Sequence, residues 1–205
     1  MILGVTGGIA AGKSTVTEIL RSLGAVVVSA DELAREVVRP GSPTLKRLTD
    51  SFGDAILAAD GTLDRKALGR KVFSDPEARH RVNRIVHPAI ADLARRRMEE
   101  LSAGGAELIV YEAPLLFEAG AEERVDAVLV VRVEESLQLA RLMVRDGLSR
   151  SEAEARIAAQ MSQGEKVARA DYVIDNSGTR QEVESRVRAL LAGLGLLCGE
   201  DAPGC

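Results

Sequence analysis

Aromatic residues are scarce in this sequence: they make up 2 % of its 205 residues, and tryptophan does not occur. So few rings leave little surface on which the bases of a single-stranded nucleic acid could stack. The formal net charge of −4 also provides no excess of basic residues to attract a polyanion or a membrane surface. We therefore expect no nucleic-acid partner and no membrane partner.

Cysteine is also rare, and long apolar runs are missing. The two cysteines, Cys198 and Cys205, lie near the C-terminus and are too few for a disulfide framework or a metal site. No apolar run approaches the roughly 20 residues needed to span a bilayer, and no basic segment with a cleavage site precedes the first run. We therefore expect a cytoplasmic protein, as a monomer or a weak homo-oligomer.

Short apolar runs alternate with helical patterns along most of the chain. Such alternation indicates an α/β fold in which helices cover both faces of a parallel sheet. Hydrophobic residues make up 46 % of the chain, enough for one compact domain, which we expect over residues 1–198 with a disordered tail at 199–205. The five runs expected to form strands are 2–5, 25–29, 108–111, 127–133 and 172–174.

Two stretches of the chain carry helical patterns without strands. Residues 42–101 separate the second run from the third and indicate a helical insertion, in which Pro88 interrupts one helix. His87 precedes that proline, so a kink could aim it into a cleft, although a lone histidine is more often structural. Two charged helices, at about 134–145 and 149–163, separate the fourth run from the fifth.

A glycine-rich motif joins the first apolar run to the first helical pattern. Residues 7–14, GGIAAGKS, fit G-x-x-x-x-G-K-[ST]. Gly7 and Gly12 allow a tight turn with inward N–H groups, and the helix N-terminus adds partial positive charge. Lys13 would reach the β- and γ-phosphates of a nucleotide, and Ser14 would offer a hydroxyl to Mg²⁺. The alternative is a glycine-rich turn that binds nothing, but the strand-to-helix context favours a site for a nucleoside triphosphate.

Residues that follow strand ends are candidates for chemistry, because open α/β sheets bind ligands there. Asp31 follows the second run, where a carboxylate could orient and deprotonate an acceptor hydroxyl or could cap the next helix. Arg35 could pair with Asp31 or hold a substrate phosphate, and the residues alone favour the ion pair. Glu112, after the third run, stands where a magnesium-supporting acid is often found.

Two further groups lie farther along the chain. Residues 114–118 (PLLFE) follow the third strand, and their apolar members, Leu115 included, are expected to pack in the core. Arg141, Arg145 and Arg150 form part of a charged stretch that is either a solvated face or a set of cations closing over a nucleotide. At most two of these three arginines are expected to be functional.

The segment after the fifth run begins with Asp175 and Asn176. In this architecture that zone commonly contacts the base or the ribose of a nucleotide. The guanine-recognition signature N-K-x-D does not occur in the sequence, which argues against a guanine-specific switch.

Taken together, these stretches resemble the dephospho-coenzyme A kinase family, from Ile2 to about Leu191. The phosphate-loop motif is shared by many families, whereas its combination with the other stretches is far more specific. They are LGVTGGIAAGKST (3–15), ADELAR (30–35), VRPG (38–41), FG (52–53), DGTLDR (60–65), HP (87–88), PLLFE (114–118) and ADYVIDNSG (170–178).

The resemblance implies transfer of the γ-phosphate of ATP, with Mg²⁺, to the ribose 3′-hydroxyl of dephospho-CoA, the last step of CoA synthesis. It implies a P-loop NTPase-type three-layer fold with a five-stranded parallel sheet. The helical stretch at 42–101 would bind the acceptor substrate, and residues at about 134–166 would form a helical lid.

The resemblance also implies residue roles. Asp31 is the expected catalytic base, and Lys13 with Arg141 or Arg145 is expected to act on the phosphates, with Ser14 as the Mg²⁺ ligand. Dephospho-CoA is expected to contact Asp31, Arg35, His87 and Leu115. ATP is expected to contact Gly7, Gly8, Ala10, Ala11, Gly12, Lys13, Ser14, Thr15 and Asn176.

The chain departs from the family pattern at a few positions. Ser29 stands where many members have aspartate, and Ala10 and Ala11 replace a glycine and a serine often found in the loop. Alanine is tolerable at position 10 if its backbone keeps a negative φ. Glu112 stands where many members have aspartate or an apolar residue.

Two other functions stay open from the sequence. One is a different small-molecule or nucleoside-monophosphate kinase on the same scaffold. The other is a nucleotide-binding switch without catalysis, which the position of Asp31 and the missing guanine signature argue against.

Overall fold

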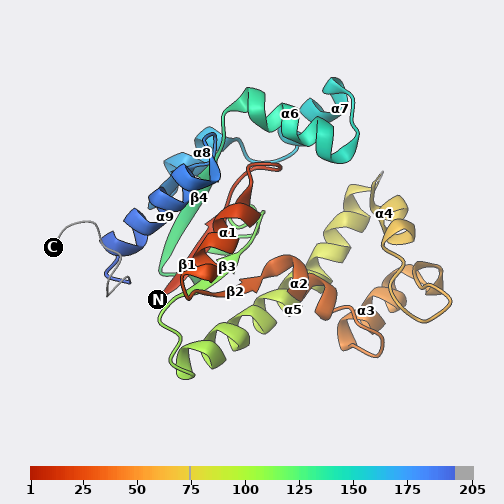
Figure 1. Cartoon of the computed structure of the whole chain (residues 1–205). Coiled ribbons are helices and arrows are strands. Elements are labelled where there is room, and N and C mark those ends of the chain that lie inside the picture. Colours follow the sequence, from red (N-terminus) through yellow and green to blue (C-terminus); the bar gives the residue numbers. More distant parts are fainter. Residues whose placement is uncertain (74, 197–205) are drawn as a thin grey trace. The chain divides into compact units, whose positions relative to one another are not determined.

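The computed structural model describes residues 1–73 and 75–196, which form two compact units (Figure 1). The sheet unit comprises Met1–Val28 and the chain from Glu100 onward, and the helical unit comprises Ser29–Glu99. Cys198, Cys205 and the expected tail at 199–205 lie outside the described residues.

The sheet unit is built on a five-stranded parallel sheet in the order β2-β3-β1-β4-β5. The central strand is β1, where Leu3 lies between Val110 of β3 and Ala127 of β4. The expected α/β fold is therefore confirmed. The strands are β1 (Ile2–Thr6), β2 (Val26–Ser29), β3 (Ile109–Glu112), β4 (Ala127–Arg132) and β5 (Tyr172–Asp175).

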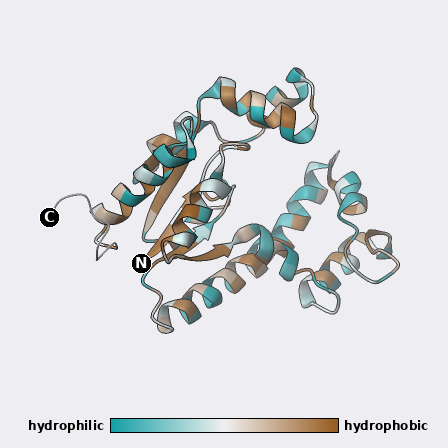
Figure 2. Ribbon diagram, viewed as in Figure 1, coloured by the Kyte–Doolittle hydropathy of each residue, from teal (hydrophilic) through white to brown (hydrophobic). Residues whose placement is uncertain are grey.

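Continuous apolar strands account for the burial of this sheet, whose strands are mostly brown in Figure 2. Leu3, Val110 and Leu129 are fully buried and belong to one cluster with apolar residues of α1 (Lys13–Ser22) and α9 (Arg180–Gly193). Burial of each such side chain contributes about 1.5–3 kcal/mol. This cluster thus anchors β1 and α1, the two segments that flank the phosphate-loop motif.

Three helices occupy the region between β4 and β5: α6 (Glu135–Asp146), α7 (Arg150–Ala158) and α8 (Gln163–Ala168). The sequence predicted two helices there, with the second reaching residue 163, and that prediction was wrong. The reason is local, because Ser162 and Glu165 form a capping box that begins a separate helix. A short 3₁₀ helix at Glu122–Arg124 completes the elements of this unit.

The helical unit has a small core of its own, which includes Val38, Leu48 and Ile85. The expected interruption at Pro88 is wrong, because α5 runs unbroken through that proline. A proline inside a helix loses one backbone hydrogen bond, and packing of neighbours such as Ile85 on the core compensates. Its helices are α2 (Ala30–Glu36), α3 (Pro43–Phe52), η1 (Asp54–Ile56), α4 (Arg65–Phe73) and α5 (Pro76–Ala103), the last of which continues into the sheet unit.

Candidate active site

The glycine-rich loop connects β1 to α1 and leaves the N-terminus of α1 open. Gly12, the N-cap residue, has φ 83°, and no side chain of the described residues caps this helix. Uncapped N–H groups at a helix N-terminus attract anions, because their partial positive charges point along the axis. The loop therefore ends in a phosphate-binding geometry.

Two glycines of the loop are required by close packing. A Cβ at Gly7 would lie 2.3 Å from the carbonyl oxygen of Val131, and a Cβ at Gly12 would lie 2.0 Å from Nδ2 of Asn176. Both distances are far below van der Waals contact. The loop is thus held closely against the neighbouring strand ends by residues that have no side chain.

The loop curls around the ammonium group of Lys13. Its Nζ donates hydrogen bonds to the carbonyl oxygens of Gly7 at 3.0 Å and Gly8 at 3.3 Å. Ser14 is exposed and Thr15 half-buried in the first turn of α1. Lysine and serine in this arrangement suit the phosphates and the metal of a nucleotide.

Ala10 has a left-handed backbone. Its φ is 59°, and it alone among the described non-glycine residues has a positive φ. The negative φ that would make alanine tolerable here is therefore not found. A left-handed alanine is strained because its Cβ crowds the following carbonyl oxygen, so surrounding contacts must hold it in place.

Asn176 and Arg141 lie against the loop. The buried amide of Asn176 donates from Nδ2 to the carbonyl oxygen of Ala11 at 2.8 Å. Arg141 donates to the backbone oxygen of Asn176 at 3.2 Å, and its Nη1 lies 3.7 Å from where a Cβ on Gly12 would stand. The side chain of Asn176 thus fixes the loop backbone, whereas the sequence suggested a contact with the base or ribose.

The other two arginines of this charged stretch engage carboxylates. Arg145 donates from Nε to Asp146 at 2.8 Å, which raises the pKa of the Arg145 guanidinium and lowers the pKa of the Asp146 carboxyl. Arg150 pairs with Glu154 at 2.8 Å on the surface of α7. Of the three candidates, Arg141 is the one placed beside the phosphate loop.

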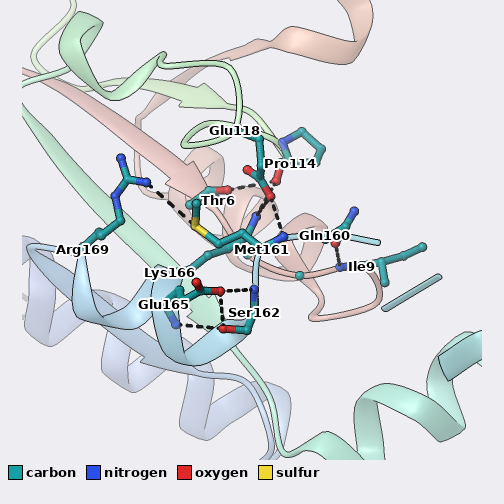
Figure 3. Close-up of polar contacts among 12 residues, drawn as sticks. Thr6, Ile9, Pro114, Glu118, Gln160, Met161, Ser162, Glu165, Lys166 and Arg169 are labelled. Carbon is teal, nitrogen blue, oxygen red and sulfur yellow. Dashed lines mark hydrogen bonds and ion pairs between the residues drawn. The ribbon is translucent and has the colours of Figure 1, made fainter. Parts of the chain in front are cut away.

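An ion pair made by a buried lysine fixes the segment that follows β3, and Figure 3 shows its contacts. Lys166 of α8 is fully buried, and its Nζ lies 2.8 Å from Oε1 of Glu118 and 3.1 Å from the carbonyl oxygen of Pro114. That carbonyl oxygen also accepts from Oγ1 of Thr6 at 3.2 Å, at the end of β1. One cation thus joins α8 to the segment after β3, and the carbonyl oxygen of Pro114 links that segment to the last residue of β1.

The apolar residues of the same segment divide into two groups. Leu116 and Phe117 are buried, and the guanidinium of Arg169 lies 4.4 Å from the centre of the Phe117 ring. Leu115 is 49 % exposed, so the expectation of core packing is confirmed for its two neighbours and is wrong for Leu115. An exposed leucine beside Pro114 is available for an apolar contact with a ligand.

The residues fit a magnesium ion carried mainly by a nucleotide. The described residues contain no group of three or more His, Cys, Asp or Glu side chains that could hold a metal alone. Mg²⁺ at nucleotide sites needs only one or two protein ligands, because phosphates and water supply the rest. Ser14, exposed in the first turn of α1, and Glu112, in register with Val5 at the end of β3, are the described candidates for that task.

In the helical unit, the cap of α2 is Ser29 and not Asp31. Oγ of Ser29 accepts a hydrogen bond from the N–H of Glu32, while Asp31 lies in the first turn with an exposed side chain. No ion pair joins Asp31 to Arg35 among the described residues, so the expected pairing is wrong. His87, on α5, is exposed as well. The structure leaves these three side chains accessible.

Sequence reasoning missed three glutamines and Lys166. Gln138 is buried and, like Gln160, bonds the backbone of Ile9 in the loop. Gln163 bonds Gln138. The available signal was Gln138 itself, an uncharged polar residue one turn before the apolar Leu142 on the inward face of α6. A cavity of about 700 Å³ borders these glutamines and Gly8.

Comparison with known proteins identifies close relatives. The family model described as dephospho-CoA kinase matches residues 1–182. A dephospho-CoA kinase of Syntrophotalea carbinolica is 56 % identical over 95 % of this chain and 92 % of the relative, and one of Geobacter sulfurreducens is 55 % identical over 93 % and 97 %.

Solved structures give the same picture. The dephospho-CoA kinase of Campylobacter jejuni has a TM-score of 0.73 and 32 % identity, with 94 % of this chain and 96 % of that chain covered. A shikimate kinase of Aquifex aeolicus shares the fold at 16 % identity, with a TM-score of 0.52 and coverage of 96 % and 99 %. None of the described helices is long and apolar enough to cross a membrane.

Proposed function

The chain belongs to the dephospho-CoA kinase family, and we propose that it transfers the γ-phosphoryl group of ATP to the ribose 3′-hydroxyl of dephospho-CoA, giving CoA and ADP. The observation that carries this proposal is the loop around Lys13 beside an uncapped helix N-terminus, in a chain more than half identical to relatives of that name. The chemistry is positioning and charge stabilisation, which is what phosphoryl transfer requires.

On the nucleotide side, the loop from Gly7 to Thr15 is proposed to hold the phosphates of ATP. Lys13 would exchange its carbonyl partners for the terminal phosphates, and Arg141 would add a second positive charge beside Gly12. When bound, Mg²⁺ would supply positive charge that neutralises the phosphates. Ser14 is the proposed protein ligand of that ion. Arg145, held at Asp146, and Asn176, held at the loop, remain further candidates for contacts with the nucleotide.

On the acceptor side, Asp31 is the proposed general base. Its carboxylate is exposed and is not used as a helix cap, because Ser29 has that role. Asp31 would orient the 3′-hydroxyl and accept its proton as the oxygen attacks the γ-phosphorus. Dephospho-CoA is proposed to bind to Arg35, His87 and Leu115. The helical stretch at 42–101 is the proposed acceptor domain, and residues 134–166 are proposed to form a lid that excludes water.

The test is an assay of ADP release with a panel of acceptors, with CoA identified as the product. We expect phosphorylation of dephospho-CoA and not of AMP or shikimate. Activity on AMP or shikimate alone would instead support another small-molecule kinase, and ATP binding without any acceptor would support a switch. We further propose that the enzyme is cytoplasmic. We also propose that it is a monomer or a weak homo-oligomer, and gel filtration across a concentration series measures its oligomeric state.

A further inference from the structure

The strained turn of the phosphate loop is the starting point. The N–H of Ala11 donates to the carbonyl oxygen of Gly8 at 3.1 Å, so residues 8–11 form a tight turn with Ala10 in its third place. Ala10 has a positive φ and Ile9 does not. This combination is that of a type II turn, which strongly favours glycine in the third place. Because alanine is strained in that place, a flip of the central peptide, which joins Ile9 to Ala10, would relieve the strain.

A chain of three glutamine contacts ends on that central peptide. The N–H of Val133 donates to Oε1 of Gln163 at 3.0 Å, and Nε2 of Gln163 donates to Oε1 of Gln138 at 2.8 Å. Nε2 of Gln138 then donates to the carbonyl oxygen of Ile9 at 2.8 Å. A backbone N–H can only donate and a backbone carbonyl can only accept, so the two ends fix the orientation of both amides.

A third glutamine holds the other side of the same residue. The N–H of Ile9 donates to Oε1 of Gln160 at 2.8 Å, a contact drawn in Figure 3. Both polar backbone groups of Ile9 are thus bonded to glutamine side chains. Gln138 is 2 % exposed, so its amide has little water to replace these bonds. We call Gln138, Gln160 and Gln163 the glutamine relay.

The relay determines where the next N–H points. The described peptide bonds are all trans, so the carbonyl of Ile9 and the N–H of Ala10 point to opposite sides of one plane. Gln138 holds the carbonyl toward α6. The N–H of Ala10 is therefore directed away from the relay, and a flip of this peptide would reverse it.

We propose that the glutamine relay is a positioning device, which selects the peptide orientation that presents the Ala10 N–H to the phosphates of ATP. The proposal rests on the proposed function only in naming ATP as the ligand. The relay performs the task that a glycine at position 10 would otherwise perform through its own backbone preference. It follows that the need for the relay depends on the residue at position 10.

The first test is Gln138→Met, which keeps the length and bulk of the side chain but removes the donor to Ile9. We expect about a tenfold loss of affinity for ATP·Mg²⁺, since one hydrogen bond that fixes the loop is lost. Gln160→Met is expected to act in the same direction, and Gln163→Met less strongly, because Gln163 acts only through Gln138. Affinity is measured by calorimetry without an acceptor, so the result does not depend on the identity of the acceptor.

The deciding test is rescue by Ala10→Gly. The ATP affinity of the Ala10→Gly protein is measured first and serves as the reference for the double variant. Combined with Gln138→Met, Ala10→Gly should restore affinity to within about threefold of that reference, because glycine itself favours the type II turn. A solely structural role of Gln138 would lower the melting temperature but would give no such rescue.

The control is Gln181→Met, a similar substitution at an exposed position of α9. It should leave ATP affinity and the melting temperature unchanged. The proposal is overturned if Gln138→Met and Gln160→Met both bind ATP normally, or if Ala10→Gly fails to restore affinity in the double variant. An unchanged protein that binds ATP but does not phosphorylate dephospho-CoA would instead refute the proposed function and leave the relay test intact.

Discussion

The two units of this protein prepare their candidate residues in opposite ways. In the sheet unit, the phosphate loop is held by Asn176, the glutamine relay and its own glycines, with most partners buried or half-buried. In the helical unit, Asp31, Arg35 and His87 are exposed, and their side chains contact no other described residue through a hydrogen bond or ion pair.

This difference matches the demands of the chemistry. A phosphate-binding loop acts through backbone N–H groups, whose direction has to be set before the ligand arrives. An acceptor-binding carboxylate or arginine on a helix surface needs accessibility, and its final geometry can form with the substrate. We therefore expect substitutions near the loop to affect stability, ATP binding or phosphoryl transfer, and substitutions of these exposed residues in the helical unit to affect acceptor binding or turnover without loss of stability.

The largest effect is expected for Lys13→Met. The ammonium group is the loop's central cation, and its loss should lower kcat/KM by about 10³–10⁵-fold, the range seen for a cation that stabilises a transferring phosphoryl group. Steady-state kinetics with dephospho-CoA measure this effect, and Lys46→Met on α3, which removes a surface lysine, is the control. Normal turnover of the Lys13 variant would show that this lysine of the loop does not take part in phosphoryl transfer.

On the helical unit, Asp31→Asn is expected to reduce kcat by about 10²–10⁴-fold, as for loss of a general base. ATP affinity and melting temperature should stay unchanged, since Asp31 neither caps α2 nor forms an ion pair. Glu32→Gln, on the next residue of the same helix, is the matched control. A fall in melting temperature would show that Asp31 has a structural role, and an unaltered kcat would show that it is not the base.

The smallest of these effects is one of stability. Lys166→Met removes the fully buried ammonium group that bonds Glu118 and the carbonyl oxygen of Pro114. It should lower the free energy of unfolding by about 2 kcal/mol, because a hydrogen bond to a charged group contributes about 1.5–3 kcal/mol. Lys46→Met, which removes an exposed ion pair with Asp50, should cost less than about 1 kcal/mol. Denaturant unfolding measures both. Equal effects for the two lysines would show that the buried Lys166 does not support the segment after β3.

Much of the site could be predicted from the sequence because it depends on chain connectivity. The five strands and the loop between β1 and α1 follow from apolar runs and glycine spacing, which are local signals. The accessibility of Asp31 could not be predicted in this way. Whether Ser29 or Asp31 caps α2 depends on where the helix begins, and a difference of two residues separates a cap from a free carboxylate.

Long-range side-chain contacts within the sheet unit could not be predicted from the sequence. Asn176 was placed correctly after β5, but its amide bonds a loop residue 165 positions earlier in the chain. The neighbours of Lys166 in the sequence are those of a surface lysine on a polar helix. Its burial follows from the packing of α8 beside the residues after β3. No periodicity carries such long-range information.

The sequence by itself determined the phosphate-loop motif, the parallel sheet and the family. Glycine spacing and apolar runs constrain the backbone locally, and family motifs are read along the chain. Only the tertiary structure decided that Ala10 is left-handed and that two glutamines, one of them oriented by a third, hold its neighbour Ile9. Backbone strain at one residue is sustained by contacts from distant segments, and these exist only once α6, α8 and the loop have packed together.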